Sequence, residues 1–474
     1  MPIRVLHVKV PGIISRTLWT RRLWGSVVFG SGNSNFIAMT QYTLNRAKCK
    51  EICYNRSMSQ RFQFPEKFYW GAATASHQIE GGQNNNWTRF EHDNASRLAA
   101  ESETGFAWNP HWEKFRQEAT DPANYISGAA CDHWNRYEED FTLIESLHLN
   151  SYRFSLEWSR LEPTEGVFDE EAFSHYEDML LSLKKKNITP FVTLWHWTLP
   201  LWLTDLGGIT HPDFPYYFER YAGKIANRLG KHVHFWITLN EPDVVAAHSY
   251  LKGVWPPQKK NPFSYLLALR RLADAHKRSY QMLKAYNPEA LVGIAKHQVA
   301  FQILRPTLYN RFLKFIADRL WNHSFLHKFK GYQDFIGLNH YNRNCIDNGF
   351  NKNPNLVQTD FGWEYYPESL TQALTELKPY NLPIYITENG LADAGDALRQ
   401  EFIPRALRAV QKALEAGVDV RGYFYWSLLD NFEWDKGFWL RFGLIQVNFA
   451  NQSRTVRKSA YLYGDIAKNG FLEG

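Results

Sequence analysis

Short apolar runs alternate along the chain with longer stretches in which apolar residues recur at spacings of three and four. Stretches of the second kind, such as 170–186 and 399–416, carry Glu, Lys and Arg between their apolar positions, as amphipathic helices do. From residue 68 onward there are eight short runs, at 68–73, 150–155, 189–195, 233–239, 291–295, 334–338, 383–387 and 421–426. This alternation predicts repeated strand–helix units built on a parallel sheet.

Eight parallel strands with intervening helices close into a barrel, so we predict an α/β protein with a single (β/α)8 (TIM) barrel. The 474 residues contain no linker rich in Pro, Gly or Ser and no internal repeat, which favours one large domain over 58–474. In such barrels the chemistry lies at the C-terminal ends of the strands. Polar residues should therefore appear where the apolar runs stop.

Residues 1–57 differ from the rest of the chain in charge. They hold nine Lys and Arg and one acid, Glu51, a charge of +8, so the chain's net +6 leaves −2 for the remainder. A mildly acidic body gives no reason to expect a nucleic-acid partner. We interpret 1–57 as a basic extension that is disordered or precedes a true start at Met58, with a targeting segment as the alternative.

The sequence lacks the features of a membrane protein, of a disulfide-rich protein and of a metal- or nucleotide-binding protein. No run reaches the roughly 18 apolar residues of a membrane helix, so we expect no membrane partner and a cytoplasmic location. The four cysteines, Cys49, Cys53, Cys131 and Cys345, are too sparse for a disulfide framework. Cys49 and Cys53 lack a second pair of zinc ligands, and no nucleotide motif appears, so we predict neither metal nor cofactor.

Polar residues do follow the apolar runs. They are Gln78, His196, Asn240, Glu241, Asn339, Tyr341, Glu388 and a cluster of Trp and Glu after the eighth run, and Arg153 lies within the second run. Cleavage of a glycosidic bond needs one carboxylic acid to protonate the leaving oxygen and one carboxylate to attack or to activate water. A single Glu after a strand is usually a helix cap or a solvated residue. Glu241 and Glu388, however, follow the fourth and seventh runs, which lie nearly across a barrel from each other.

Six ordered motifs resemble glycoside hydrolase family 1, whose members are retaining β-glycosidases on this barrel. They are FPEKFYWGAATASHQIEG (64–81), YRFSLEWSR (152–160), TLWHWTLP (193–200), NEP (240–242), TENG (387–390) and YWSLLDNFEW (425–434). The resemblance covers nearly everything from residue 64 to residue 468. Six motifs in the family's order are not expected by chance.

The resemblance implies roles for the strand-end residues. Glu241 would be the general acid and then the general base, and Glu388 the nucleophile, about 5 Å apart as retention of configuration requires. Arg153 and Tyr341 would keep Glu388 ionised, one by charge and one by a hydrogen bond, and Asn339 joins this catalytic set.

The resemblance also implies a set of sugar-binding residues. Gln78, His196, Asn240 and Glu433 would bind hydroxyl groups, and Trp426 and Trp434 would pack against the sugar ring, with Trp197 and Phe442 nearby. Without the motif, a lone histidine such as His196 would more often be an ordinary core residue.

The expected activity is hydrolysis of terminal β-D-glycosyl residues, with β-glucosidase favoured and β-galactosidase or β-fucosidase activity as alternatives. An acidic Glu433 would repel a 6-phosphosugar, although Lys436 and Arg441 lie close in sequence. Two rival readings are an inactive carbohydrate-binding homologue and an enzyme that transfers the glycosyl group to an acceptor other than water. The segment 298–332 is short and basic where relatives shape the leaving-group side, so the leaving group stays open, as does the oligomeric state.

Overall fold

The computed structural model describes residues 61–473, and the predicted extension 1–57 and domain start at 58 lie outside them. Eight parallel strands close a barrel in the order β10-β11-β2-β3-β4-β5-β6-β8. These strands are β2 (Tyr69–Ala73), β3 (Ser151–Ser155), β4 (Thr189–Trp195), β5 (Phe235–Asn240), β6 (Leu291–His297), β8 (Phe335–Asn339), β10 (Ile384–Asn389) and β11 (Val420–Trp426). The predicted (β/α)8 barrel is therefore confirmed, with strand ends shifted by at most two residues.

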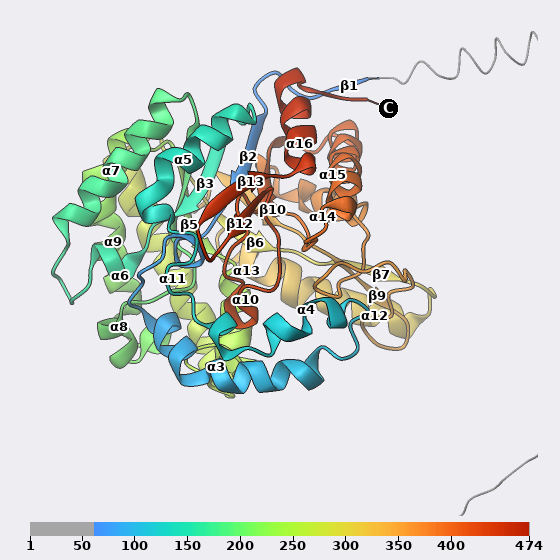
Figure 1. Ribbon diagram of the computed structural model, residues 1–474, viewed down its shortest axis with the longest axis horizontal. Coiled ribbons are helices and arrows are strands. Elements are labelled where there is room, and N and C mark those ends of the chain that lie inside the picture. The colour runs from blue at the N-terminus through green and yellow to red at the C-terminus, as the bar shows by residue number, and fades with distance from the viewer. Residues whose placement is uncertain (1–60, 474) are drawn as a thin grey trace, which may run out of the picture. The chain divides into compact units, whose positions relative to one another are not determined.

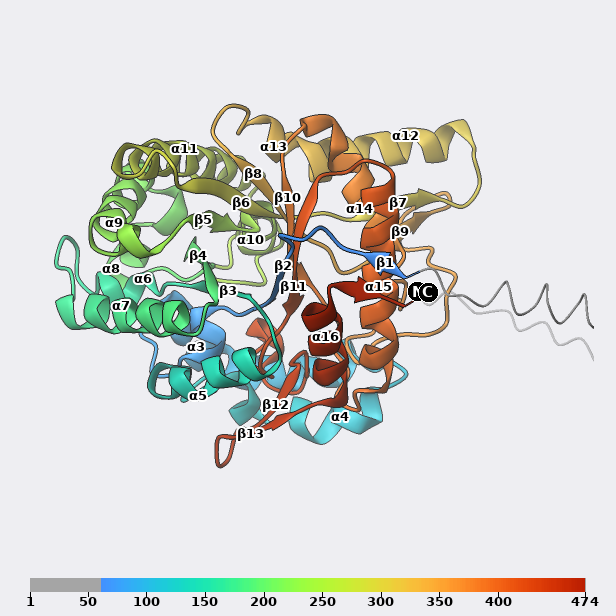
Figure 2. The ribbon, with the colours of Figure 1, turned by 90° about the horizontal axis from the view of Figure 1, so that it is seen from above.

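Helices surround the barrel, one after each strand (Figures 1 and 2). They are α5 (His133–Ser146), α7 (Glu170–Lys185), α9 (Phe214–Leu229), α11 (Pro262–Tyr286), α13 (Ser324–His327), α14 (Ser369–Leu377), α15 (Ala397–Glu415) and α16 (Lys458–Asn469). Helix α7 shows why they form. Asp169 caps its first turn by accepting from Glu171 N and Ala172 N, both at 2.9 Å. Its buried residues include Phe173 and Tyr176, spaced by three on one side.

Aromatic side chains fill the N-terminal end of the barrel interior. Phe191 of β4 stacks on Phe235 of β5 with ring centroids 4.1 Å apart, and Tyr69, Phe335 and Tyr385 pack edge-on around Phe235. All five rings come from the first half of their strands. The interior is therefore closed at this end, and a binding site can open only at the other.

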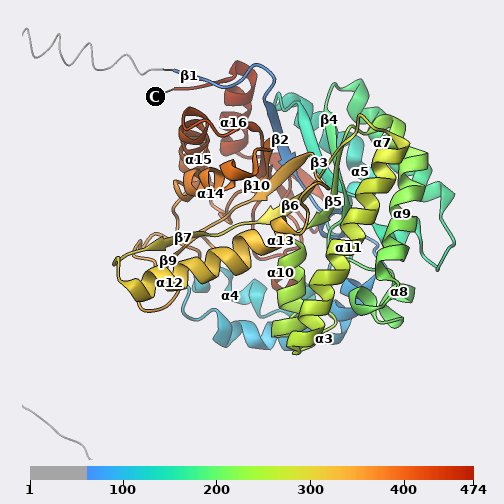
Figure 3. The ribbon, with the colours of Figure 1, turned by 180° about the vertical axis from the view of Figure 1, so that it is seen from behind.

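Three excursions beyond the eight strand–helix units were not among the predicted elements. Helices α3 (Asn86–Gly105) and α4 (Trp112–Ala119) follow β2, and a hairpin of β12 (Ile445–Asn448) and β13 (Ser453–Val456) follows β11. The third excursion joins the parallel pair β7 (Ala300–Ile303) and β9 (Arg343–Ile346) to helix α12 (Leu308–Ala317), which continues into the π-helical η5 (Asp318–His323). Figure 3 shows α12 beside β7 and β9 at one edge of the barrel.

Within residues 61–473, Cys131 and Cys345 are buried and free, and no helix is both long and apolar enough to cross a bilayer. Cys49 and Cys53 lie outside the described residues. Short strands β1 (Phe62–Gln63) and β14 (Phe471–Leu472) pair with each other and bring the two ends of the described chain together.

Candidate active site

Glu241 stands directly after β5, at the turn into the short helix α10 (Pro242–Ala246). Its backbone lies in the left-handed region, with φ of 42°, and its N–H donates to Ala295 O on the neighbouring strand at 2.8 Å. A non-glycine residue in this region is held there by its surroundings and is a common feature of functional sites. The side chain of Glu241 is buried and accepts from Asn339 Nδ2 at 2.8 Å.

Glu388 is the next-to-last residue of β10, and each of its carboxylate oxygens is bound by a different donor. Arg153 Nη1 lies 2.5 Å from Oε1, and Tyr341 Oη donates to Oε2 at 2.7 Å. The Arg153 side chain is fully buried and that of Glu388 is 5% exposed, so the ion pair is shielded from solvent. A buried guanidinium with a hydrogen bond stabilises the ionised form of its carboxylate partner.

A chain of buried hydrogen bonds links the two carboxylates. Arg153 Nη2 donates to Asn240 Oδ1 at 2.7 Å, and Asn339 Nδ2 donates both to that oxygen, at 3.0 Å, and to Glu241. Thr387 fixes the Asn339 amide by donating to its Oδ1 at 2.7 Å. The six side chains, with both glutamates included, lie in β3, β5, β8 and β10 or directly after β5, so closure of the barrel sets their positions.

The two carboxyl groups are in different electrostatic environments. Burial, followed by the negative charge of Glu388, raises the pKa of Glu241 well above its ordinary value. A buried ion pair beside Glu241, Lys296 Nζ with Asp243 Oδ2 at 2.8 Å, adds effects of opposite sign on that pKa. Burial and the charge of Glu388 also raise the pKa of Tyr341, which therefore stays a hydrogen-bond donor. One carboxyl group thus has a raised pKa, whereas the other is bound by two hydrogen-bond donors.

Two side chains beside this network leave polar atoms unbonded. Asn240 Nδ2 lies 2.9 Å from His196 Nε2, and burial together with Arg153 lowers the pKa of His196, so the ring is neutral and its hydrogen is on Nδ1. That nitrogen and Gln78 Oε1 are buried and have no partner among residues 61–473. A buried donor and a buried acceptor without partners are suited to a ligand hydroxyl.

Glu433 was expected to carry a negative charge, and the structure favours its neutral form. Burial and the charge of Glu388 raise its pKa to about 8, so it is mostly protonated at neutral pH. Repulsion of phosphate by this residue is therefore weaker than its residue type suggested. The nearby cations are also neutralised: Lys436 pairs with Asp435 at 2.7 Å, and Arg441 pairs with Glu118 at 2.7 Å.

A cavity of about 520 Å³ opens above the two carboxylates, a size suited to a small ligand. Most of the predicted site residues line it: His196, Trp197, Glu241, Tyr341, Glu388, Trp426, Glu433, Trp434 and Phe442. The others, Gln78, Arg153, Asn240 and Asn339, are buried and bond to lining residues. The structure therefore brings all the predicted residues to one place.

Several lining residues were not predicted, namely Val244, His248, Lys252, Val254, Trp255, His297, Trp321, Asn342, Phe361, Trp363 and Asp435. His297 could have been found from the sequence, because it is a polar residue just after the predicted run 291–295 and ends β6 in the structure. Trp321 and Trp363 had no such signal, since Trp321 lies in η5 of the excursion after β6 and Trp363 in an irregular segment after β9.

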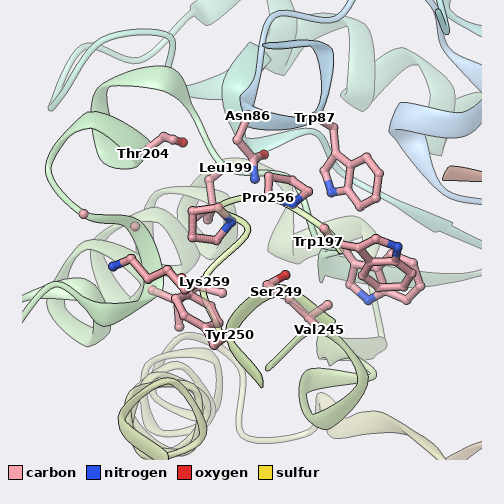
Figure 4. A pocket seen from close by; sticks show the side chains of 15 residues that line it. Asn86, Trp87, Trp197, Leu199, Thr204, Val245, Ser249, Tyr250, Pro256 and Lys259 are labelled. Carbon is pink, nitrogen blue, oxygen red and sulfur yellow. The ribbon is translucent and has the colours of Figure 1, made fainter. Parts of the chain in front are cut away.

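A smaller cavity of about 130 Å³ lies beside this one and shares Trp197 and Trp255 with it. Figure 4 shows its wall, with Trp197 and Trp87 on one side and Leu199, Tyr250 and Pro256 on the other. No carboxylate lines it. Nor is any group of three His, Cys, Asp or Glu residues within 61–473 placed to hold a metal ion.

The sequence matches the family model described as Glycosyl hydrolase family 1 over residues 60–307 and 322–471. The chain belongs to glycosyl hydrolase family 1. The protein is therefore a glycoside hydrolase, and its barrel is the fold of the solved structures that it resembles. The two matched stretches leave out 308–321, which includes all of α12.

Relatives of known activity and structure cover almost the same span. The chain is 32% identical over 462 residues to Beta-glucosidase A of Thermotoga maritima, covering 87% of this chain and 99% of that protein. A β-glycosidase from Pyrococcus horikoshii superposes with a TM-score of 0.77 at 36% identity, over 88% of this chain and 97% of that one. The T. maritima β-glucosidase in complex with deoxynojirimycin superposes with a TM-score of 0.75 at 31% identity, over 87% and 100%.

Proposed function

We propose that the enzyme is a retaining β-glycosidase, of β-glucosidase type, that works by double displacement through a covalent glycosyl-enzyme. The observation that supports this most is the asymmetry of the two carboxyl groups. Glu388 is held by Arg153 and Tyr341, whereas burial and the charge of Glu388 raise the pKa of Glu241. These are the states that a nucleophile and a general acid need at the start of the reaction.

In the first step, a carboxylate oxygen of Glu388 attacks the anomeric carbon while the bond from that carbon to the leaving oxygen breaks. Glu241 gives its proton to the leaving oxygen, so the alcohol departs neutral and Glu241 becomes a carboxylate. Once Glu388 is esterified, its negative charge is gone, and the main electrostatic cause of the raised Glu241 pKa is gone with it. Glu241 can then act as a base.

In the second step, Glu241 takes a proton from a water molecule whose oxygen attacks the anomeric carbon. The ester bond to Glu388 breaks, Glu388 is again a carboxylate, and Glu241 is again protonated. Two inversions give net retention, for which the carboxyl groups should stand about 5 Å apart. Arg153 and Tyr341 accept the returning charge of Glu388 without rearranging, because their hydrogen bonds are already formed.

The sugar is proposed to lie between the carboxylates and the tryptophans. His196 Nδ1 and Gln78 Oε1 would take hydroxyl groups, since both atoms lack partners in the part of the chain that the structure describes. Protonated Glu433 can donate as well as accept. Trp426 and Trp434 line the same cavity and offer apolar surface for the C–H side of the ring.

A panel of nitrophenyl glycosides tests this proposal. We expect turnover of the β-D-glucoside, with the β-galactoside and β-fucoside as weaker substrates, and little turnover of the β-D-glucoside 6-phosphate. Proton NMR at early times should show the β-anomer of the released sugar first. Release of the α-anomer first would refute the retaining mechanism, and a strict need for the 6-phosphate would refute the substrate class.

Tyr341→Phe removes one of the two donors on Glu388 without opening a large cavity. Loss of a hydrogen bond to a charged group costs about 1.5–3 kcal/mol, so we expect kcat/KM for the aryl glucoside to fall roughly 10- to 100-fold. Tyr280→Phe is the matched control, because Tyr280 Oη bonds the carboxylate of Asp334 at 3.1 Å outside the cavity. Equal losses in both variants would contradict the assigned role of Tyr341.

A further inference from the structure

Helix α12 turns its apolar stripe toward solvent. Leu308, Phe312 and Phe315 are spaced by four and three residues and are 87%, 57% and 61% exposed. Tyr309 and Leu320 flank them and are 55% and 66% exposed. A stripe with this spacing normally packs against the core, and a concentration of exposed aromatic and aliphatic side chains marks an interaction surface. These five residues are called the α12 face below.

The orientation of α12 is fixed by specific contacts. Thr307 caps the helix by accepting from Asn310 N at 3.1 Å. The buried Asn310 side chain donates to Arg305 O at 2.9 Å and accepts from Asn348 N at 2.8 Å, in the loop after β9. On the next turn, Lys314 pairs with Asp318 at 2.6 Å and Glu376 at 3.3 Å. The polar side of the helix is therefore bonded to the loop after β9 and to α14, which leaves the apolar stripe outside.

Basic residues surround the α12 face. The segment 304–332 contains six Lys and Arg and one acid, Asp318, whereas residues 58–474 as a whole carry −2. Arg311 and Arg319 lie on the exposed side of α12 and η5, and neither forms an ion pair within residues 61–473. An apolar stripe with free cations beside it is the pattern of a helix that lies in the surface of an anionic membrane.

The α12 face is separate from the family's shared features, because the stretches that match the family omit 308–321. It is nevertheless continuous with the active site. Helix α12 runs directly into η5, where Trp321 lines the catalytic cavity. Figures 2 and 3 both place α12 at an edge of the barrel, where no other helix of residues 61–473 covers it.

We propose that the α12 face binds the surface of a lipid bilayer that contains anionic headgroups. The phenylalanines and Leu308 enter the interface between headgroups and acyl chains, and Arg311 and Arg319 contact the phosphates. A second copy of the chain fits this surface less well, since a twofold contact would bring the same free arginines together. Absence of a spanning helix does not oppose the proposal, because a surface-bound helix needs no span.

Sedimentation with vesicles tests the proposal on the full chain. We expect binding to vesicles of about three parts phosphatidylcholine to one part phosphatidylglycerol, weakened by salt, and much weaker binding to phosphatidylcholine alone. The triple variant Leu308→Ser, Phe312→Ser, Phe315→Ser should bind roughly 10- to 100-fold more weakly, because the apolar area that enters the bilayer is lost. All three side chains are exposed, so the variant should fold and hydrolyse a water-soluble aryl glucoside normally.

The matched control is Leu181→Ser with Tyr461→Ser, which removes exposed apolar side chains from α7 and α16, and it should bind vesicles like the parent. Arg311→Gln with Arg319→Gln should lower both the affinity and its dependence on salt. No binding to the anionic vesicles, or unchanged binding of the triple variant, would overturn the proposal. So would a parent that is dimeric by light scattering and becomes monomeric in the triple variant, since the α12 face would then be a contact between copies.

Discussion

Glu388→Gln is expected to abolish hydrolysis of aryl β-glucosides, with kcat lower by a factor on the order of 10⁵. The amide cannot form the glycosyl ester, so the first displacement has no nucleophile. Gln keeps the size of the side chain and one oxygen that can accept from Arg153, so the fold and substrate binding should persist. Stopped-flow kinetics and calorimetric titration with the β-glucoside measure the two properties separately.

A second buried glutamate paired with arginine provides the control. The Glu162 side chain is fully buried and pairs with Arg220, and it does not line the catalytic cavity. Glu162→Gln should therefore lower stability while leaving kcat within a few fold of the parent enzyme. Retention of most activity in Glu388→Gln, with loss in Glu162→Gln, would disprove the assignment of the nucleophile.

Glu241→Ala should slow the enzyme in a manner that depends on the leaving group. General acid catalysis contributes about 10²- to 10⁴-fold, and a leaving group that departs without protonation does not need it. We expect an alkyl or unactivated aryl glucoside to lose that factor, while dinitrophenyl glucoside forms the glycosyl-enzyme nearly as fast as in the parent. Added azide should restore turnover and yield the β-glycosyl azide, which chromatography can identify.

The same variant tests the electrostatics of the site. In the parent, kcat/KM should fall on the alkaline side as Glu241 loses its proton, at a pH above the ordinary range of a glutamate because burial and Glu388 raise its pKa. Glu241→Ala with the dinitrophenyl substrate should lack that alkaline limb. If azide gave the α-azide, or if the limb persisted, Glu241 would not be the acid and base.

Much of this site could be predicted because the C-terminal ends of all the strands in a barrel lie together at one end. Glu241 and Glu388 are 147 positions apart in numbering, yet each follows an apolar run, and parallel strands bring such positions together. The buried core enforces these runs, so their pattern is visible in sequence. The end of β6 was placed two residues early because Lys296 and His297 are polar, although tertiary packing keeps them in the strand.

Other features follow from packing that the sequence does not display. Trp321 reaches the cavity from η5 and Trp363 from an irregular segment after β9, and both lie beyond the strand ends that the sequence pattern marks. The protonation of Glu433 depends on its burial and on its place near Glu388, and neither property is encoded by residue type. The α12 face shows the opposite case: its spacing predicts an ordinary core-packed helix, and only the structure shows that the stripe points outward.

The five aromatic rings close the N-terminal end of the barrel, so the catalytic cavity opens only at the C-terminal ends of the strands. In the proposed mechanism, the water that resolves the glycosyl-enzyme therefore enters from the open end of the cavity, where the alcohol departs. An alcohol that remains in the outer half of the cavity competes with water for attack on the glycosyl-enzyme. In the proposed mechanism, the ratio of hydrolysis to transfer therefore depends on how fast the outer half of the cavity empties, because Glu241 serves as the base for water and for an alcohol alike.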